Sequence, residues 1–76
     1  MSDLAAIVRA TRASATALRA IQDITRLLRD DLWPAGMPAI ARMERGVLNE
    51  RLGAARRRYA RAQHVLASNP LPGDAA

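Results

Sequence analysis

The stretch DDLWPAGMP, residues 30–38, decides the fold because it interrupts a sequence that is otherwise rich in helix-forming residues. Trp33 precedes Pro34, and the proline ring pushes the preceding residue out of the α-helical region. Gly36 has access to turn conformations that are closed to other residues. Pro38 suits the first turn of a new helix. We therefore predict that the chain reverses direction here, between two helices.

The segment before this turn has the periodicity of one long helix, which we expect over residues 2–32. Ser2 is a good N-cap, and Asp3 lies where the helix dipole favours an acid. An inward stripe recurs alternately every four and three residues, a heptad rhythm that predicts packing against another helix. Three of its eight positions are Ser or Thr, which favours a close approach of that helix. The stripe consists of Ile7, Thr11, Ser14, Leu18, Ile21, Thr25, Leu28 and Leu32.

The segment after the turn, residues 38–67, is predicted to form a second helix with two apolar stripes. Together they span more of the helix than a single packing partner requires. A charged row lies between them, formed by Glu44, Arg51 and Arg58. We expect one stripe to pack on the first helix and the other to contact a different chain. The first stripe is Ala41, Leu48, Leu52, Ala55, Tyr59, Ala62 and Leu66, and the second is Ile40, Met43, Val47, Ala54 and Val65.

These segments predict an all-α fold, an antiparallel, coiled-coil-like hairpin of two helices over residues 1–68 with its turn at 33–37. A hairpin centred near residue 36 places small residues opposite small residues. The facing sets are Ala13, Ala15 and Ala17 on the first helix and Gly53, Ala54 and Ala55 on the second. Residues 69–76 contain two prolines and a glycine, so we expect an extended C-terminal tail there.

The length of 76 residues bounds the stability that the chain can reach alone. A domain of this size buries only about 60% of the surface that its unfolded chain exposes. The sequence has no cysteine and one histidine, His64, which argues against disulfides and a dedicated zinc site. We therefore expect no metal and no cofactor, and we expect other protein subunits, identical or different, to supply the missing stability.

Catalytic motifs are missing from the sequence. It has no glycine-rich phosphate loop, no His–Glu metal helix and no nucleophile elbow. Asp30 and Asp31 are adjacent, so on a helix they point about 100° apart; they suit a helix end or pairing with Arg42. His64 is expected on the outer face of its helix. We predict that the protein is not an enzyme.

The net charge is +5, and all twelve basic residues are arginine. Such a charge favours an acidic partner, which is nucleic acid, an anionic membrane or an acidic protein. No apolar run approaches the roughly 18 residues of a membrane span. The N-terminus lacks the basic-then-apolar order of a signal peptide. We expect a cytoplasmic or virion location.

Five of the arginines fall within RLGAARRRYAR, residues 51–61. On a helical wheel they scatter over the outer half of the helix, whereas a DNA-reading helix gathers them on one face with amide or hydroxyl side chains. Phosphate contacts without sequence readout stay open, with Arg56, Arg57, Arg58 and Arg61 as candidates. A solvated face or ion pairs with another subunit are the preferred interpretation. A membrane surface suits the sequence poorly, since it has no Phe and its one Trp falls in the turn.

These observations predict a structural or adaptor subunit of a larger assembly, such as a phage or phage-like virion component (a head–tail connector, tail or minor capsid protein). The alternative is a basic helical protein that binds the DNA or RNA backbone non-specifically. Trp33 is expected either to cover the open end of the hairpin or to anchor an interface. The predicted partner-binding residues are Ile40, Met43, Val47, Arg51, Arg58, Arg61, Val65 and Trp33.

Overall fold

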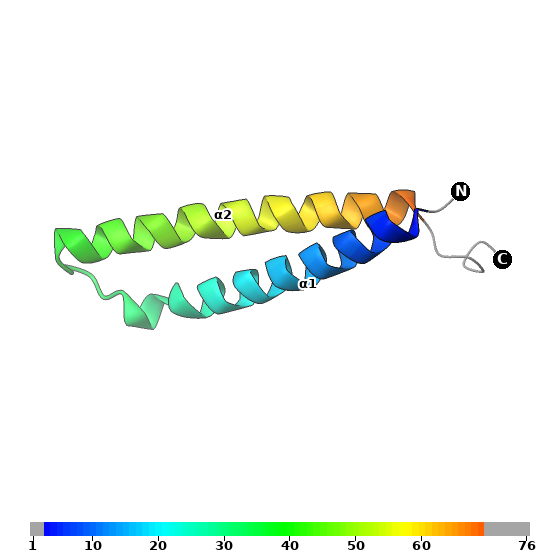
Figure 1. Ribbon diagram of the computed structural model, residues 1–76. Helices are drawn as coiled ribbons and strands as arrows, with labels where there is room; N and C mark the ends of the chain where they lie inside the picture. The colour runs from blue at the N-terminus through cyan, green and yellow to red at the C-terminus, as the bar shows by residue number, and fades with distance from the viewer. Residues whose placement is uncertain (1–2, 70–76) are drawn as a thin grey trace.

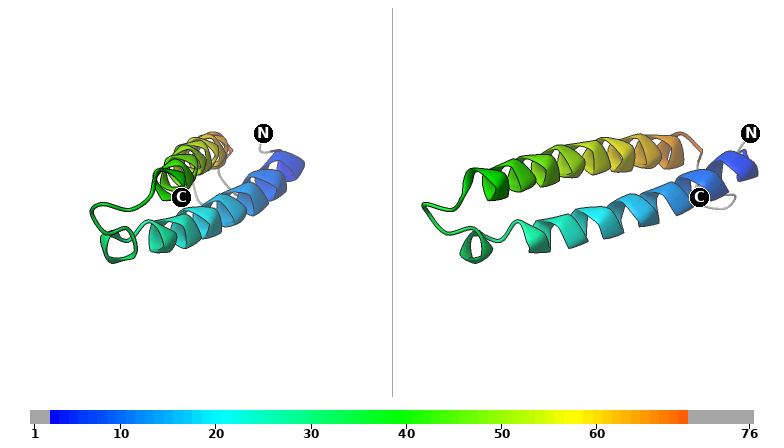
Figure 2. Two further views of the ribbon diagram at one scale, coloured as in Figure 1. Left: turned by 90° about the vertical axis from the view of Figure 1, so that its left-hand side faces the viewer. Right: turned by 60° about the vertical axis from the view of Figure 1, so that its left-hand side comes forward.

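The computed structural model describes residues 3–69, which form an antiparallel hairpin of two α-helices and contain no strand (Figure 1). Helix α1 spans Leu4–Leu27 and helix α2 spans Ala39–Ser68. The segment between them contains a short 3₁₀ helix, η1, at Asp30–Leu32. The two helices lie side by side along their length, and the chain reverses at one end of the resulting rod (Figure 2). The predicted helical hairpin is confirmed; Ser2 and residues 70–76 of the predicted tail lie outside the described residues.

The helix ends differ from the predicted bounds for local reasons. Asp3 is the N-cap of α1, because its carboxylate accepts the backbone N–H of Ala6 at 3.1 Å. Helix α1 ends at Leu27 instead of residue 32, since the backbone of Arg29 leaves the α region with φ −57° and ψ 136°. Pro38 is the N-cap of α2 and not its first helical residue.

Half of the predicted inward stripe of α1 is wrong. The residues at its four-residue steps are exposed: Thr11, Leu18, Thr25 and Leu32. Most of the buried and half-buried positions instead follow three-then-four spacing: Ile7, Ala10, Ser14, Ala17, Ile21, Ile24 and Leu28. Ala6 and Ala20, next to this row, are also half-buried. The close contact between the helices selects the small Ala10 and Ala17 over their larger neighbours, so α1 is rotated relative to the prediction.

The first stripe of α2 is confirmed, since all seven of its residues are buried or half-buried. The hairpin register also agrees with a centre near residue 36. The backbone N–H of Asp3 donates to Oδ1 of Asn69 at 3.4 Å, and Nε2 of Gln63 donates to Oγ of Ser14 at 2.8 Å. Ala17 and Ala55, which are equally distant from residue 36, are the most buried residues described, at 2% and 0% exposure.

The predicted contact of small residues is only partly right, because Ala13 and Ala15 are exposed. On α2, Gly53 and Ala54 of the predicted set are half-buried and Ala55 is buried. One helix can cover only one narrow face of its neighbour, and three alanines at alternate positions of a helix do not share a face.

The core lies at one end of the hairpin. All the buried residues fall in the termini half, defined as residues 3–17 and 52–69: Ile7, Ala10, Ala17, Leu52, Ala55 and Ala62. The turn half, residues 18–51, contains no buried residue. It does contain six of the eight large hydrophobic side chains that are exposed within residues 3–69: Leu18, Leu27, Leu32, Ile40, Met43 and Val47.

Candidate partner-binding surface

The turn half carries a shallow groove on the surface of α2. Its volume is about 400 Å³. Ile40, Met43 and Val47 line it and are 69%, 71% and 46% exposed. The remaining lining residues are Glu44, Leu48 and Arg51. The structure therefore brings together four of the predicted partner-binding residues, the three apolar ones and Arg51, in one groove.

The termini half carries a second groove, of about 390 Å³, between the two helices. Arg58, Arg61 and Val65 line it from α2, as members of the predicted partner-binding set. The other lining residues are Ala6, Arg9, Ala10 and Ala13 of α1, and Ala62 of α2. The α1 wall was not predicted, because every predicted partner-binding residue lies on α2 or, for Trp33, in the turn. The spacing of Ala6, Ala10 and Ala13 at four and three residues was the available signal.

Both grooves lie along the same flank of α2. Glu44, Arg51, Arg58 and Val65 recur at seven-residue intervals, and seven residues are close to two helical turns. The first two of these residues line the groove of the turn half, and the last two line the groove of the termini half. The predicted residues of α2 thus form two parts of one lateral surface.

Trp33 lies apart from both grooves and makes a contact within the hairpin. It is half-buried, and its indole Nε1 donates to the backbone carbonyl of Leu27 at 2.6 Å. This hydrogen bond satisfies one of the carbonyl groups left open at the end of α1. Trp33 therefore closes the last turn of α1, while its role as a cover of the hairpin end or as an interface anchor stays a prediction.

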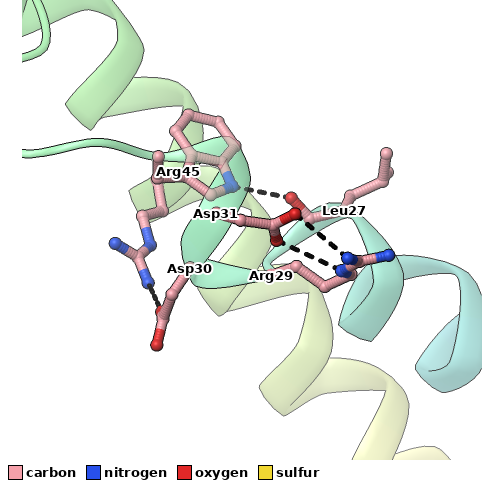
Figure 3. Close-up of polar contacts among 6 residues, drawn as sticks. Leu27, Arg29, Asp30, Asp31 and Arg45 are labelled. Atoms are coloured by element: carbon pink, nitrogen blue, oxygen red, sulfur yellow. Dashed lines mark hydrogen bonds and ion pairs between the residues drawn. The ribbon is translucent and has the colours of Figure 1, made fainter.

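Charged side chains fix the turn, as Figure 3 shows. Arg29 donates from Nε and Nη2 to the two carboxylate oxygens of Asp31, at 3.2 and 3.0 Å. Arg45 donates from Nη2 to Asp30 across the turn, at 3.0 Å. The partner of the acidic pair across the turn is therefore Arg45 and not Arg42.

The arginines of residues 51–61 have no ion-pair partner among residues 3–69. The three ion pairs of the described chain all lie in the turn half, and the third joins Arg26 to Asp23 at 3.4 Å. The four arginines that are candidates for phosphate contacts do not lie on one surface. Arg58 and Arg61 line the groove of the termini half, whereas Arg56 and Arg57 line neither groove. The positive charge of residues 51–61 is thus uncompensated within the described chain and faces more than one direction.

Residues 3–69 contain neither a metal-binding cluster nor a membrane-spanning helix. That part of the chain contains no group of three or more His, Asp or Glu side chains arranged to hold a metal ion. Neither α1 nor α2 combines the length and the apolar character that crossing a membrane requires. Comparison with protein-family models, curated proteins and solved structures gave no match for this chain.

Proposed function

We propose that this chain is a non-enzymatic structural or adaptor subunit, a helical hairpin that acts by packing against other protein subunits. Its working surface is the lateral face of α2 that contains Ile40, Met43 and Val47. From the sequence, we propose that the assembly is a phage-like virion and that this chain is one of its components.

The observation that supports this function is the exposed apolar surface of the turn half. Six large hydrophobic side chains are exposed there, and no residue of that half is buried. Monomeric proteins rarely expose contiguous apolar patches of more than a few hundred Å², and larger patches typically mark interaction sites. Ile40, Met43 and Val47 gather around one groove, which gives a partner side chain a place to insert.

The test measures the mass of the purified chain in solution by light scattering, before and after Val47→Asp. We expect a species larger than one chain, and we expect the substitution to reduce its mass while the helix signal in circular dichroism persists. Leu4→Asp is the matched control, because Leu4 is 64% exposed and lines neither groove. A stable, monodisperse monomer, or an equal effect of the control, contradicts the proposal.

A second candidate function is non-specific binding to a nucleic-acid backbone. The uncompensated arginines of residues 51–61 favour it, because phosphate binding needs guanidinium groups that are free of internal partners. Binding to duplex DNA at low salt, which weakens steeply as salt rises, is the expected result for this candidate. Absence of DNA binding at low salt removes it.

A further inference from the structure

The groove of the termini half differs from that of the turn half because both helices form its walls. Five of its lining side chains are apolar, and we term them its floor: the small Ala6, Ala10, Ala13 and Ala62 together with Val65. Arg9 of α1 and Arg58 and Arg61 of α2 also line it. Among residues 3–69, no acidic residue lines it and none of these arginines has an ion-pair partner.

We propose that this groove binds one amphipathic helix of an acidic partner protein, which completes a three-helix bundle with α1 and α2. This inference rests on the proposed function and names the partner chemistry at a surface that the function alone does not specify. The partner helix has large apolar side chains on one face and carboxylates along both edges of that face.

The shape of the groove matches the apolar face of such a helix. Alanine side chains leave space above the helix backbones, and large side chains of a third helix fill that space. Packing of this kind brings helix axes to about 8–10 Å from each other. Ala10 and Ala62, at 5% exposure each, already belong to the core between α1 and α2. A third helix therefore extends the existing core instead of building a separate one.

The charges at the groove match the edges of such a helix. A guanidinium group binds a carboxylate through two parallel hydrogen bonds, the strongest common geometry for an ion pair. Arg9 projects from one wall, and Arg58 and Arg61 project from the other. Carboxylates on both edges of the incoming helix thus find a partner on each side.

Charge also decides against the other occupants. A second copy of this chain presents the same arginines, so two such grooves repel each other. A nucleic-acid backbone would gain nothing from contact with the apolar floor. It would also bind Arg56 and Arg57 as readily as the arginines of the groove. An acidic amphipathic helix contacts both the apolar floor and the arginines of the groove.

The test uses the full chain and a labelled synthetic peptide of about three heptads, with Leu at the core positions and Glu at the flanking positions. A peptide with Lys in place of Glu is the control. Fluorescence anisotropy at physiological salt is expected to show binding of the Glu peptide only. Failure of the Glu peptide to bind, or equal binding of the Lys peptide, overturns the proposal.

Two pairs of matched variants locate the binding site. Arg58→Glu with Arg61→Glu is expected to weaken binding of the Glu peptide by about tenfold or more, because two ion pairs become repulsive. Arg56→Glu with Arg57→Glu changes the charge equally outside the groove and is expected to have a much smaller effect. Equal losses in the two double variants indicate a diffuse basic surface and overturn the proposal.

Ala13→Trp tests the groove itself without changing charge. Ala13 is exposed and lines the groove, so the indole is expected to occupy the space of the incoming helix and abolish binding. Ala15→Trp is the control, since Ala15 is exposed and lines neither groove. Full binding by the Ala13 variant contradicts the proposal. If the Glu peptide fails while the mass of the assembly still depends on Val47, the proposed function stands and only this inference falls.

Discussion

The termini half and the turn half of the hairpin are stabilised in different ways. In the termini half, alanines from both helices are fully covered by the neighbouring helix, notably Ala17 and Ala55. In the turn half, the facing residues are large ones, and one neighbouring helix leaves them half-exposed: Ile21, Ile24, Leu28 and Leu48. The close approach of the helices in the termini half also covers the large Ile7 and Leu52, at 7% and 9% exposure, whereas the large side chains of the turn half stay half-exposed. The turn half therefore has apolar surface left for a partner, and the termini half has the core.

Removal of one large side chain from each half is expected to have unequal effects on stability. Leu52→Ala in the termini half is expected to reduce the free energy of unfolding by about 2–5 kcal/mol, because Leu52 is 9% exposed and its loss leaves a cavity. Met43→Ala in the turn half is expected to change the stability of the isolated chain little, since Met43 is 71% exposed. Urea denaturation followed by circular dichroism, at one protein concentration, measures both values.

Equal losses in these two variants would show that the turn half has a buried core of its own in solution. Repeating the measurement in the presence of the assembly partner sharpens the test. There, Met43→Ala is expected to become costly, because the proposed contact buries this side chain.

The sequence was sufficient to predict the turn, the two helices and the packing face of α2. That face was predictable because large apolar residues, such as Leu48, Leu52 and Leu66, stand out against polar neighbours. Only half of the packing face of α1 was predictable. Alanines occur on every side of that helix, so the sequence gives no contrast between its buried and exposed faces. The larger Leu18 drew the prediction away from Ala17, which the close approach of the helices requires.

The groove between the helices could not be predicted from the sequence, for a related reason. Its walls come from both helices, so its location depends on how each is rotated about its own axis. Arg58 and Arg61 were identified from the arginine-rich stretch, whereas Arg9 was not, since only the structure places it across from them. A rotation of α1 by one position changes which of its residues line such a groove.

The second prediction tests the close helix contact directly. Ala55→Leu is expected to destabilise the chain by about 1–3 kcal/mol, because Ala55 is 0% exposed and the added atoms have no space. Ala60→Leu on the exposed side of the same helix adds the same atoms without a clash. Thermal or urea denaturation of the two variants gives the difference. Similar stabilities of the two would mean that the helices lie further apart in solution.

The third prediction compares two glycines of the turn half, for which the same substitution has opposite signs. Gly36 has φ +80°, a conformation that a Cβ makes unfavourable, so Gly36→Ala is expected to cost about 1 kcal/mol. Gly46 lies within α2, and a Cβ added there meets no atom within 4 Å. Gly46→Ala is therefore expected to stabilise the isolated chain by about 0.5–1 kcal/mol. Two changes of the same sign would contradict the assigned turn or the continuous helix.

The smallest effect is expected for the ion pair that joins η1 to α2. Asp30→Asn removes the charge partner of Arg45, and the Asp30 side chain is 97% exposed. Exposed ion pairs contribute little because water and salt screen them, so the loss is expected to stay below about 1 kcal/mol and to vanish at high salt. A double-mutant cycle with Arg45→Gln isolates the pair from other effects of each substitution. A larger coupling that persists in high salt would mean that polar contacts at the turn stabilise the hairpin in addition to its apolar core. The turn half would then contribute to the stability of the isolated chain, against the contrast drawn between the two halves.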